Sequence, residues 1–138
     1  VLAHLVFPLV LDQTRKAYNE DFQMWLLTNI KEIYDKVWVK FKTFYEENVH
    51  FKLYRNEQFK QRYLKSIMAD ALGYTGTEII RRVVGDSKVK ELSLITEDKK
   101  VHAERLLVNY GKHLIKNREN ISSGNELVDI FNQCKEGI

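Results

Sequence analysis

Two adjacent arginines, Arg81 and Arg82, are the residues of this sequence whose chemistry is hardest to explain by packing alone. They lie in GYTGTEIIRRVVG, residues 73–85, where most of the other side chains are apolar or small. Removing a guanidinium group from water is costly unless an anion or a hydroxyl-rich partner meets it. Neighbouring positions on a helix point about 100° apart, so the pair can donate hydrogen bonds to two sides of one small object. The pair is therefore the first candidate for a binding site.

Spacing leaves two interpretations of the pair open. Glu78 precedes Arg82 by four residues, the spacing of a surface ion pair worth roughly 0.3 to 0.5 kcal/mol on a helix. Spacing alone favours this interpretation. The other is that Gly73 and Gly85 let neighbouring backbone pack closely and fix a short helix, so that both guanidinium groups reach into a cleft.

The rest of the sequence offers no catalytic or metal-binding constellation. His102 and His113 share a helical face, but their separation corresponds to about 16 Å, too far for one metal ion. No serine, histidine and acid arrangement can be proposed, and the glycines around Thr75 lack the lysine of a phosphate-binding loop. The lone Cys134 cannot form an internal disulfide, which fits a reducing cytoplasm. We therefore assign no catalytic residue and no metal ligand within the chain.

Length and charge bound the class of protein. A chain of 138 residues suits one domain, residues 1–138. Its 22 basic and 19 acidic side chains are interspersed, unlike the clustered charge of a dedicated nucleic-acid binder. The opening VLAHLVFPLVL is shorter than the about 20 apolar residues that span a bilayer. We expect a cytoplasmic protein that binds neither nucleic acid nor membranes, and the abrupt apolar start suggests a piece of a longer protein.

Apolar periodicity predicts an all-α fold of about five to six helices around one long, aromatic-rich helix. The long helix is expected over residues 15–45, and a second over 59–72, ended by Gly73 as a C-cap. Thr75 and Glu78 have capping-box spacing and predict a new short helix ended by Gly85. Residues 86–95 read as a connector or short turn, followed by a helix from Thr96 to about 118. A second capping box at Ser123 predicts a last helix over 127–134.

Several stretches, in order along the chain, resemble the C-terminal part of 5-methylthioribose kinases. Residues 72–85, LGYTGTEIIRRVVG, resemble the family's "LGFAG…IRR…G". Upstream, FQMWLL at 22–27 is similar to the family's "YQ-x-WLL". Downstream, residues 103–105, 111–112 and LIKNRENIS at 114–122 resemble its closing helix and "LIKRREHIS"-like tail. The likeness covers nearly the whole chain.

The resemblance implies a protein-kinase-like fold, related to aminoglycoside and choline kinases, that transfers the γ-phosphate of ATP to the 1-hydroxyl of 5-methylthioribose in methionine salvage. The chain would be its helical C-terminal subdomain, with ATP and Mg²⁺ bound by a preceding part that supplies the catalytic groups. By itself the chain is expected to be inactive. The resemblance also suggests a homodimer for the whole enzyme, and it assigns Arg81 and Arg82 to binding the methylthioribose.

The sequence departs from the family pattern at two places beside the arginines. Residues 86–89 read DSKV where the family has a stretch like "LAHV", so Lys88 stands in a histidine's place, and Glu78 puts an acid next to the pair. The second could hold Arg82 in position or partly neutralise it.

A different class of function remains as an alternative. The chain could be a stand-alone helical interaction module whose basic face meets an acidic protein or nucleic acid. That face would consist of Lys99, Lys100, Arg105, Lys112, Lys116 and Arg118. We favour the kinase interpretation because the alternative explains neither the abrupt start nor the ordered set of matches, and because such charge runs are mostly solvated faces.

Overall fold

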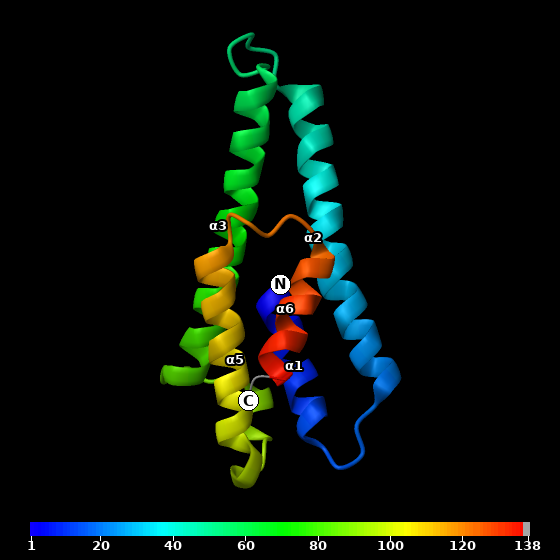
Figure 1. The fold of residues 1–138 in the computed structure, drawn as a ribbon, viewed down its shortest axis with the longest axis vertical. Helices are drawn as coiled ribbons and strands as arrows, with labels where there is room; N and C mark the ends of the chain where they lie inside the picture. Colours follow the sequence, from blue (N-terminus) through cyan, green and yellow to red (C-terminus); the bar gives the residue numbers. More distant parts are fainter. Residues whose placement is uncertain (137–138) are drawn as a thin grey trace.

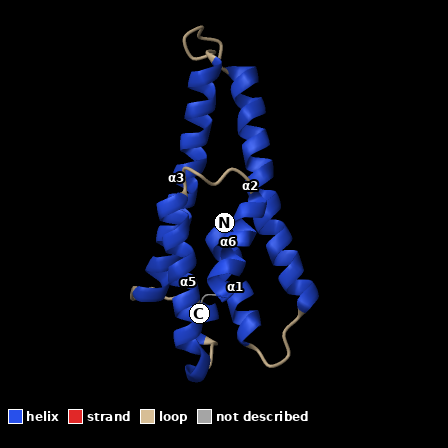
Figure 2. Ribbon diagram, viewed as in Figure 1, coloured by secondary structure: helices blue, strands red, loops and turns tan. Residues whose placement is uncertain are grey.

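All regular secondary structure in the described residues, 1–136, is helical in the computed structural model (Figures 1 and 2). The elements are α1 (Leu2–Thr14), α2 (Glu20–Asn48), α3 (Glu57–Val84), α4 (Lys90–Ser93), α5 (Glu97–Asn117) and α6 (Gly124–Glu136). The expected all-α class with about five to six helices is confirmed. The long helices α2 and α3 meet near their connecting loop and diverge away from it (Figure 1). The helix α1 packs against both of them, and α6 packs against α2 and α5.

The short helix α1 is the most thoroughly buried element. It contacts α2, α3, α4 and α5, and a helix that is apolar on all sides needs such cover. Its buried residues are Ala3, Val6, Phe7, Leu9, Val10, Leu11 and Asp12. The long helix α2 buries far less of its apolar stripe. Only its N-terminal half, which is the lower half in Figure 1, packs against α1 and α6. Its aromatic residues toward the α2–α3 loop, such as Phe41 and Phe44, remain exposed.

The long helix begins at Glu20, and the expected start at Arg15 was wrong. Arg15 has extended backbone at the end of α1, and the side chain of Asn19 caps α2 by accepting a hydrogen bond from Phe22 N at 3.0 Å. The buried carboxylate of Asp12 holds this turn, because it accepts Asn19 N at 2.9 Å and Gln23 Nε2 at 2.8 Å. Capping therefore overrides the apolar periodicity that continues back to Tyr18.

The helix break expected at Gly73 does not exist. The segment forms one continuous helix, α3, which runs through both Gly73 and Gly76. Thr75 opens no capping box, since its Oγ1 donates to Ala71 O at 2.8 Å as a mid-helix hydroxyl does. The helix is stabilised here by packing along α5, its most extensive partner. Gly85 ends the helix, as predicted, with its N–H donating to Arg81 O.

The remaining helices begin close to where the sequence placed them. Thr96 is the N-cap of α5, and α4 is the short turn expected between residues 86 and 95. At the start of α6, Ser123 Oγ accepts Glu126 N at 3.3 Å, as in a capping box. The Glu126 carboxylate, however, accepts Ser122 N at 3.1 Å, one residue before the expected position. The last helix, Gly124–Glu136, extends beyond the expected range of 127–134 at both ends.

Candidate functional site

The arginine pair is held by a single carboxylate on the last two turns of α3. Arg81 donates from Nε and Nη2 to Glu78 Oε2, at 2.9 and 2.6 Å. Arg82 donates from Nε to the other oxygen, Oε1, at 2.7 Å. The ion pair expected between Glu78 and Arg82 is thus present, and Arg81 shares it. Both oxygens of one acid are used to orient two guanidinium groups.

Arg82 is fixed at a second point. Its Nη1 donates to Ser87 Oγ at 2.8 Å and to Ser87 O at 3.0 Å. No local pattern indicated this contact, since Ser87 lies beyond the end of α3 and follows the C-cap residue Gly85. The side chain of Arg82 is 23% exposed, whereas that of Arg81 is 56% exposed. Arg82 is therefore the less exposed of the two donors and contacts two residues, whereas Arg81 contacts one.

Each guanidinium keeps donors that no described residue uses. Arg81 Nη1 and Arg82 Nη2 make no hydrogen bond among residues 1–136. A guanidinium presents its N–H groups in a rigid plane, which suits hydroxyl or anionic oxygens. The hydrogen bonds from Arg82 and then Arg81 hold the pKa of the Glu78 carboxyl below its ordinary 4.5. At neutral pH the cluster is thus two cations and one anion.

An apolar hollow of about 450 Å³ lies beside this cluster, between the start of α1, α2 and the middle of α3. Glu78 lies at its edge, together with Tyr74 and Thr75 from the preceding turn of α3. Neither arginine lines it. Glu78, which accepts hydrogen bonds from both guanidinium groups, therefore connects the arginine cluster to the hollow. A ligand with an apolar end and a hydroxylated end could contact both.

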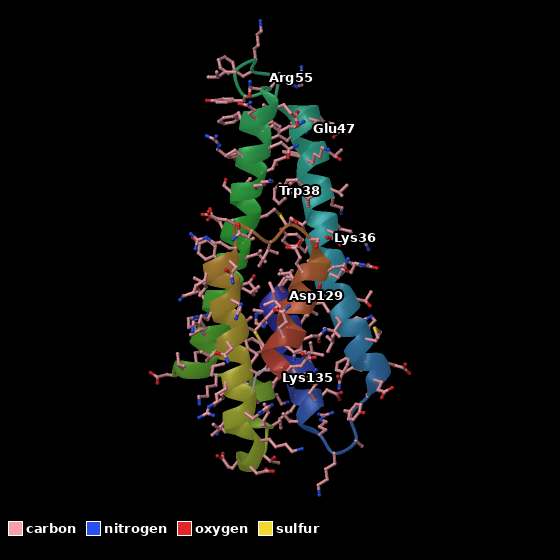
Figure 3. All side chains as sticks on the ribbon, in the orientation of Figure 1. Lys36, Trp38, Glu47, Arg55, Asp129 and Lys135 are labelled. Carbon is pink, nitrogen blue, oxygen red and sulfur yellow. The ribbon has the colours of Figure 1, made fainter. Side chains whose placement is uncertain are left out.

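A second hollow, about 470 Å³, lies at the loop end of the α2–α3 hairpin and is lined by aromatic and aliphatic side chains. Figure 3 shows Arg55 at this end of the hairpin, with Glu47 on α2 nearby. No charged or amide side chain lines the hollow, so it offers little to orient a sugar. Its lining is Phe41, Phe44, Tyr45, Val49, Tyr54, Phe59, Tyr63, Leu64 and Ile67.

The basic face of the alternative function is only partly free. Lys99 Nζ donates to Thr14 O at 2.6 Å, and Lys100 pairs with Glu97 at 2.9 Å. Arg118 Nη1 donates to Ile115 O at 3.4 Å, and its side chain lies against Gly73. These three cations therefore have partners within the chain. The exposed remainder is Arg105, Lys112 and Lys116.

Other reactive groups do not gather into a site in the part of the chain that the structure describes. No group of three or more His, Cys, Asp or Glu residues within residues 1–136 is arranged to hold a metal ion. Cys134 is buried, and burial raises the pKa of its thiol, which disfavours the reactive thiolate. Among the described helices, none combines the length and apolar character needed to cross a membrane.

Comparison with curated proteins finds several relatives, all named methylthioribose kinase. The chain is 32% identical over 103 residues to the methylthioribose kinase of Enterobacter sp. (strain 638), covering 74% of this chain and 26% of that protein. It is 39% identical over 71 residues to that of Klebsiella pneumoniae (strain 342), covering 51% and 18%. Methylthioribose kinase 2 of Oryza sativa subsp. japonica is 25% identical over 126 residues, covering 83% and 29%. No family model matches the chain.

These relatives define the chain as a homologue of small-molecule kinases. In particular, it is homologous to the C-terminal part of the methylthioribose kinases, which confirms the resemblance found in the sequence. The match covers 26% of the Enterobacter protein and 29% of the rice protein, so the chain spans about a quarter of the length of these curated relatives.

Proposed function

We propose that the chain is the substrate-binding, C-terminal part of a kinase that transfers the γ-phosphate of ATP to the 1-hydroxyl of 5-methylthioribose. In this proposal Arg81 and Arg82 bind the sugar. The observation that supports it best is that each guanidinium keeps N–H donors that the Glu78 carboxylate does not use. Orientation of the acceptor hydroxyl supplies much of the catalysis in phosphoryl transfer. A rigid two-pronged donor is suited to that role.

ATP and Mg²⁺ belong, in this proposal, to a part of the kinase outside these 138 residues. The relatives support such a division because they are roughly four times as long as the chain's match to them. Phosphoryl transfer requires a phosphate-covering loop, a lysine on the phosphates, a base and acidic metal ligands. The single helical subdomain proposed here contributes the sugar-binding donors, so the isolated chain should not phosphorylate methylthioribose. A cytoplasmic location and a homodimer of the full-length enzyme are further parts of the proposal.

The test replaces each arginine in the full-length kinase. Arg82→Ala should lower kcat/KM for methylthioribose by about 30-fold or more, because losing a charged hydrogen bond to a bound partner costs on the order of 2 kcal/mol. Arg81→Ala should have a similar or smaller effect, since that side chain is more exposed. Arg105→Ala, on the exposed side of α5, is the matched control and should leave the kinetics unchanged. Wild-type kinetics in both α3 variants would show that the arginines form a surface ion pair only.

The alternative, a module that binds an acidic partner through α5, draws on fewer residues than the sequence suggested. Lys99 and Lys100 are engaged within the chain. The three exposed cations of α5 are the whole of the surface left to it. No observation in the structure favours this function over the kinase.

A further inference from the structure

The arginine cluster carries less positive charge than its two arginines alone would give. Arg81 and Arg82 carry two positive charges, and Glu78 cancels one of them, so the cluster carries one net positive charge. Lys88, the nearest lysine in sequence, points to a different acid, Glu104, at 3.8 Å. A site built only to hold a phosphate would gain by omitting the carboxylate.

Glu78 is hydrogen-bonded to both arginines at once. Each of its oxygens accepts from a different arginine, at 2.9 and 2.6 Å from Arg81 and 2.7 Å from Arg82. The second anchor of Arg82, on Ser87, keeps that guanidinium close to the carboxylate. A ligand that meets the unused donors therefore lies near an ionised acid.

We infer that Glu78 tunes specificity, reducing the preference that the arginine pair would otherwise have for the phosphorylated product over the neutral sugar. The inference rests on the proposed function, because it requires the arginines to meet the sugar close to the hydroxyl that is phosphorylated. Sugar hydroxyls are neutral, so a nearby carboxylate changes their binding little. A phosphate monoester carries about −1.5 to −2 charges at neutral pH, and the Glu78 carboxylate repels it. Glu78 thus weakens the product complex selectively and favours product release.

The experiment compares substrate and product affinities in the full-length kinase. Glu78→Gln keeps the size of the side chain and one acceptor oxygen and removes its charge, but its NH2 group cannot accept from the second arginine. The decisive quantity is therefore the ratio of the product inhibition constant to KM. The inhibition constant of the phosphorylated product should fall about tenfold, while KM for methylthioribose changes less than about threefold. The enhancement should shrink as salt is added, since the effect is electrostatic at a partly exposed site. Glu104→Gln, which removes the partner of Lys88 instead, is the control and should change neither constant.

A product inhibition constant that stays the same, or falls by the same factor as KM, would overturn the inference. A second variant tests it should Glu78→Gln fail to fold. Ser87 is exposed and contacts Arg82, so Ser87→Asp adds a carboxylate to the same guanidinium. The ratio of product inhibition constant to KM should then rise about tenfold, and an unchanged ratio would contradict the inference.

The two proposals fail in distinguishable ways. If Arg82→Ala leaves kcat/KM unchanged, the arginines do not bind the sugar and the proposed function of this site is wrong. If Arg82→Ala lowers kcat/KM while Glu78→Gln leaves the ratio of product to substrate affinity unchanged, the site binds sugar and only the role of Glu78 is wrong.

Discussion

Gly76 of α3 and Gly111 of α5 are in direct backbone contact where the two helices pack together. A Cβ added to Gly111 would lie 2.9 Å from Gly76 O, and one added to Gly76 would overlap Gly111 O. Side chains are absent at both positions, so the helices approach more closely than any other residue would allow. This contact sets the position of the last two turns of α3, which carry Glu78 and the arginines.

Gly76→Ala should therefore destabilise the protein by about 1 to 3 kcal/mol, the range for overpacking a site that cannot expand. The neighbours are backbone atoms of Gly111 and the side chain of Ile115, and the backbone cannot shift without moving α5. Denaturant unfolding followed by circular dichroism measures the change.

Gly73→Ala is the matched control, three residues away on the same helix. A Cβ there meets only the flexible side chain of Arg118, at 3.3 Å from its Cδ. Alanine is the better helix former by up to about 1 kcal/mol, so this variant should be neutral or more stable. Equal destabilisation by the two variants would mean that α3 and α5 are not in close contact.

Tyr34→Phe should cost about 1 to 3 kcal/mol, the cost of leaving a buried polar group without its partner. The Tyr34 hydroxyl donates to Ile121 O at 2.9 Å in a buried hydrogen bond between α2 and the loop before α6. Thermal unfolding would detect the loss. Tyr74→Phe removes a hydroxyl from a side chain that is 78% exposed and should change the stability by less than about 0.5 kcal/mol. A Tyr34→Phe variant as stable as that control would contradict the contact.

Local signals in the sequence were sufficient for the helical class and for several helix ends. Gly85 ends α3 at a position where a Cβ would lie 2.5 Å from Arg81 O, and Thr96 is the N-cap of α5, although its side chain makes no capping hydrogen bond. The same kind of signal misled at Gly73 and Thr75, where the partner helix α5 keeps α3 helical. Whether a glycine ends a helix or serves a close helix contact depends on residues some 35 positions away, such as Gly111, which periodicity does not report.

The candidate site divides in the same way. The pairing of Glu78 with Arg82 follows from a spacing of four residues, so the sequence predicted it. The contact of Ser87 with Arg82 depends on the path of the chain after Gly85, for which no local rule exists. The hollow beside Glu78 needs three helices to be placed and could not be predicted. The role of the arginines in binding sugar remains a prediction.

Lys99→Met should destabilise the protein by about 1.5 to 3 kcal/mol, the range for a hydrogen bond to a charged group. Lys99 Nζ donates to Thr14 O at 2.6 Å and so satisfies a carbonyl at the end of α1, the most buried helix. Lys100→Met is the control next to it. Lys100 pairs with the exposed Glu97 three residues earlier, a contact worth about 0.5 kcal/mol or less. Denaturant unfolding should separate the two variants clearly, and similar values would argue against the contact with α1.

The Glu126 carboxylate should make the stability fall in acid. It accepts hydrogen bonds from Ser122 N at 3.1 Å and Ser122 Oγ at 2.8 Å at the start of α6. These bonds, the backbone one first, hold the pKa of the Glu126 carboxyl below its ordinary 4.5. A lowered folded-state pKa means that the unfolded chain binds the proton first, so the stabilisation is complete above pH 4.5 and is lost as the pH falls through the folded value.

Glu126→Gln should therefore be less stable than the wild type at pH 7 by about 1 kcal/mol or less, and the difference should disappear in acid. Denaturant unfolding at a series of pH values from neutral to acidic measures both the difference in stability at pH 7 and its loss in acid. Glu119→Gln, at an exposed position in the preceding turn, should give a difference near zero throughout. A Glu126→Gln difference that persists below the folded pKa would mean that the cap acts through packing and not through the charge of the carboxylate.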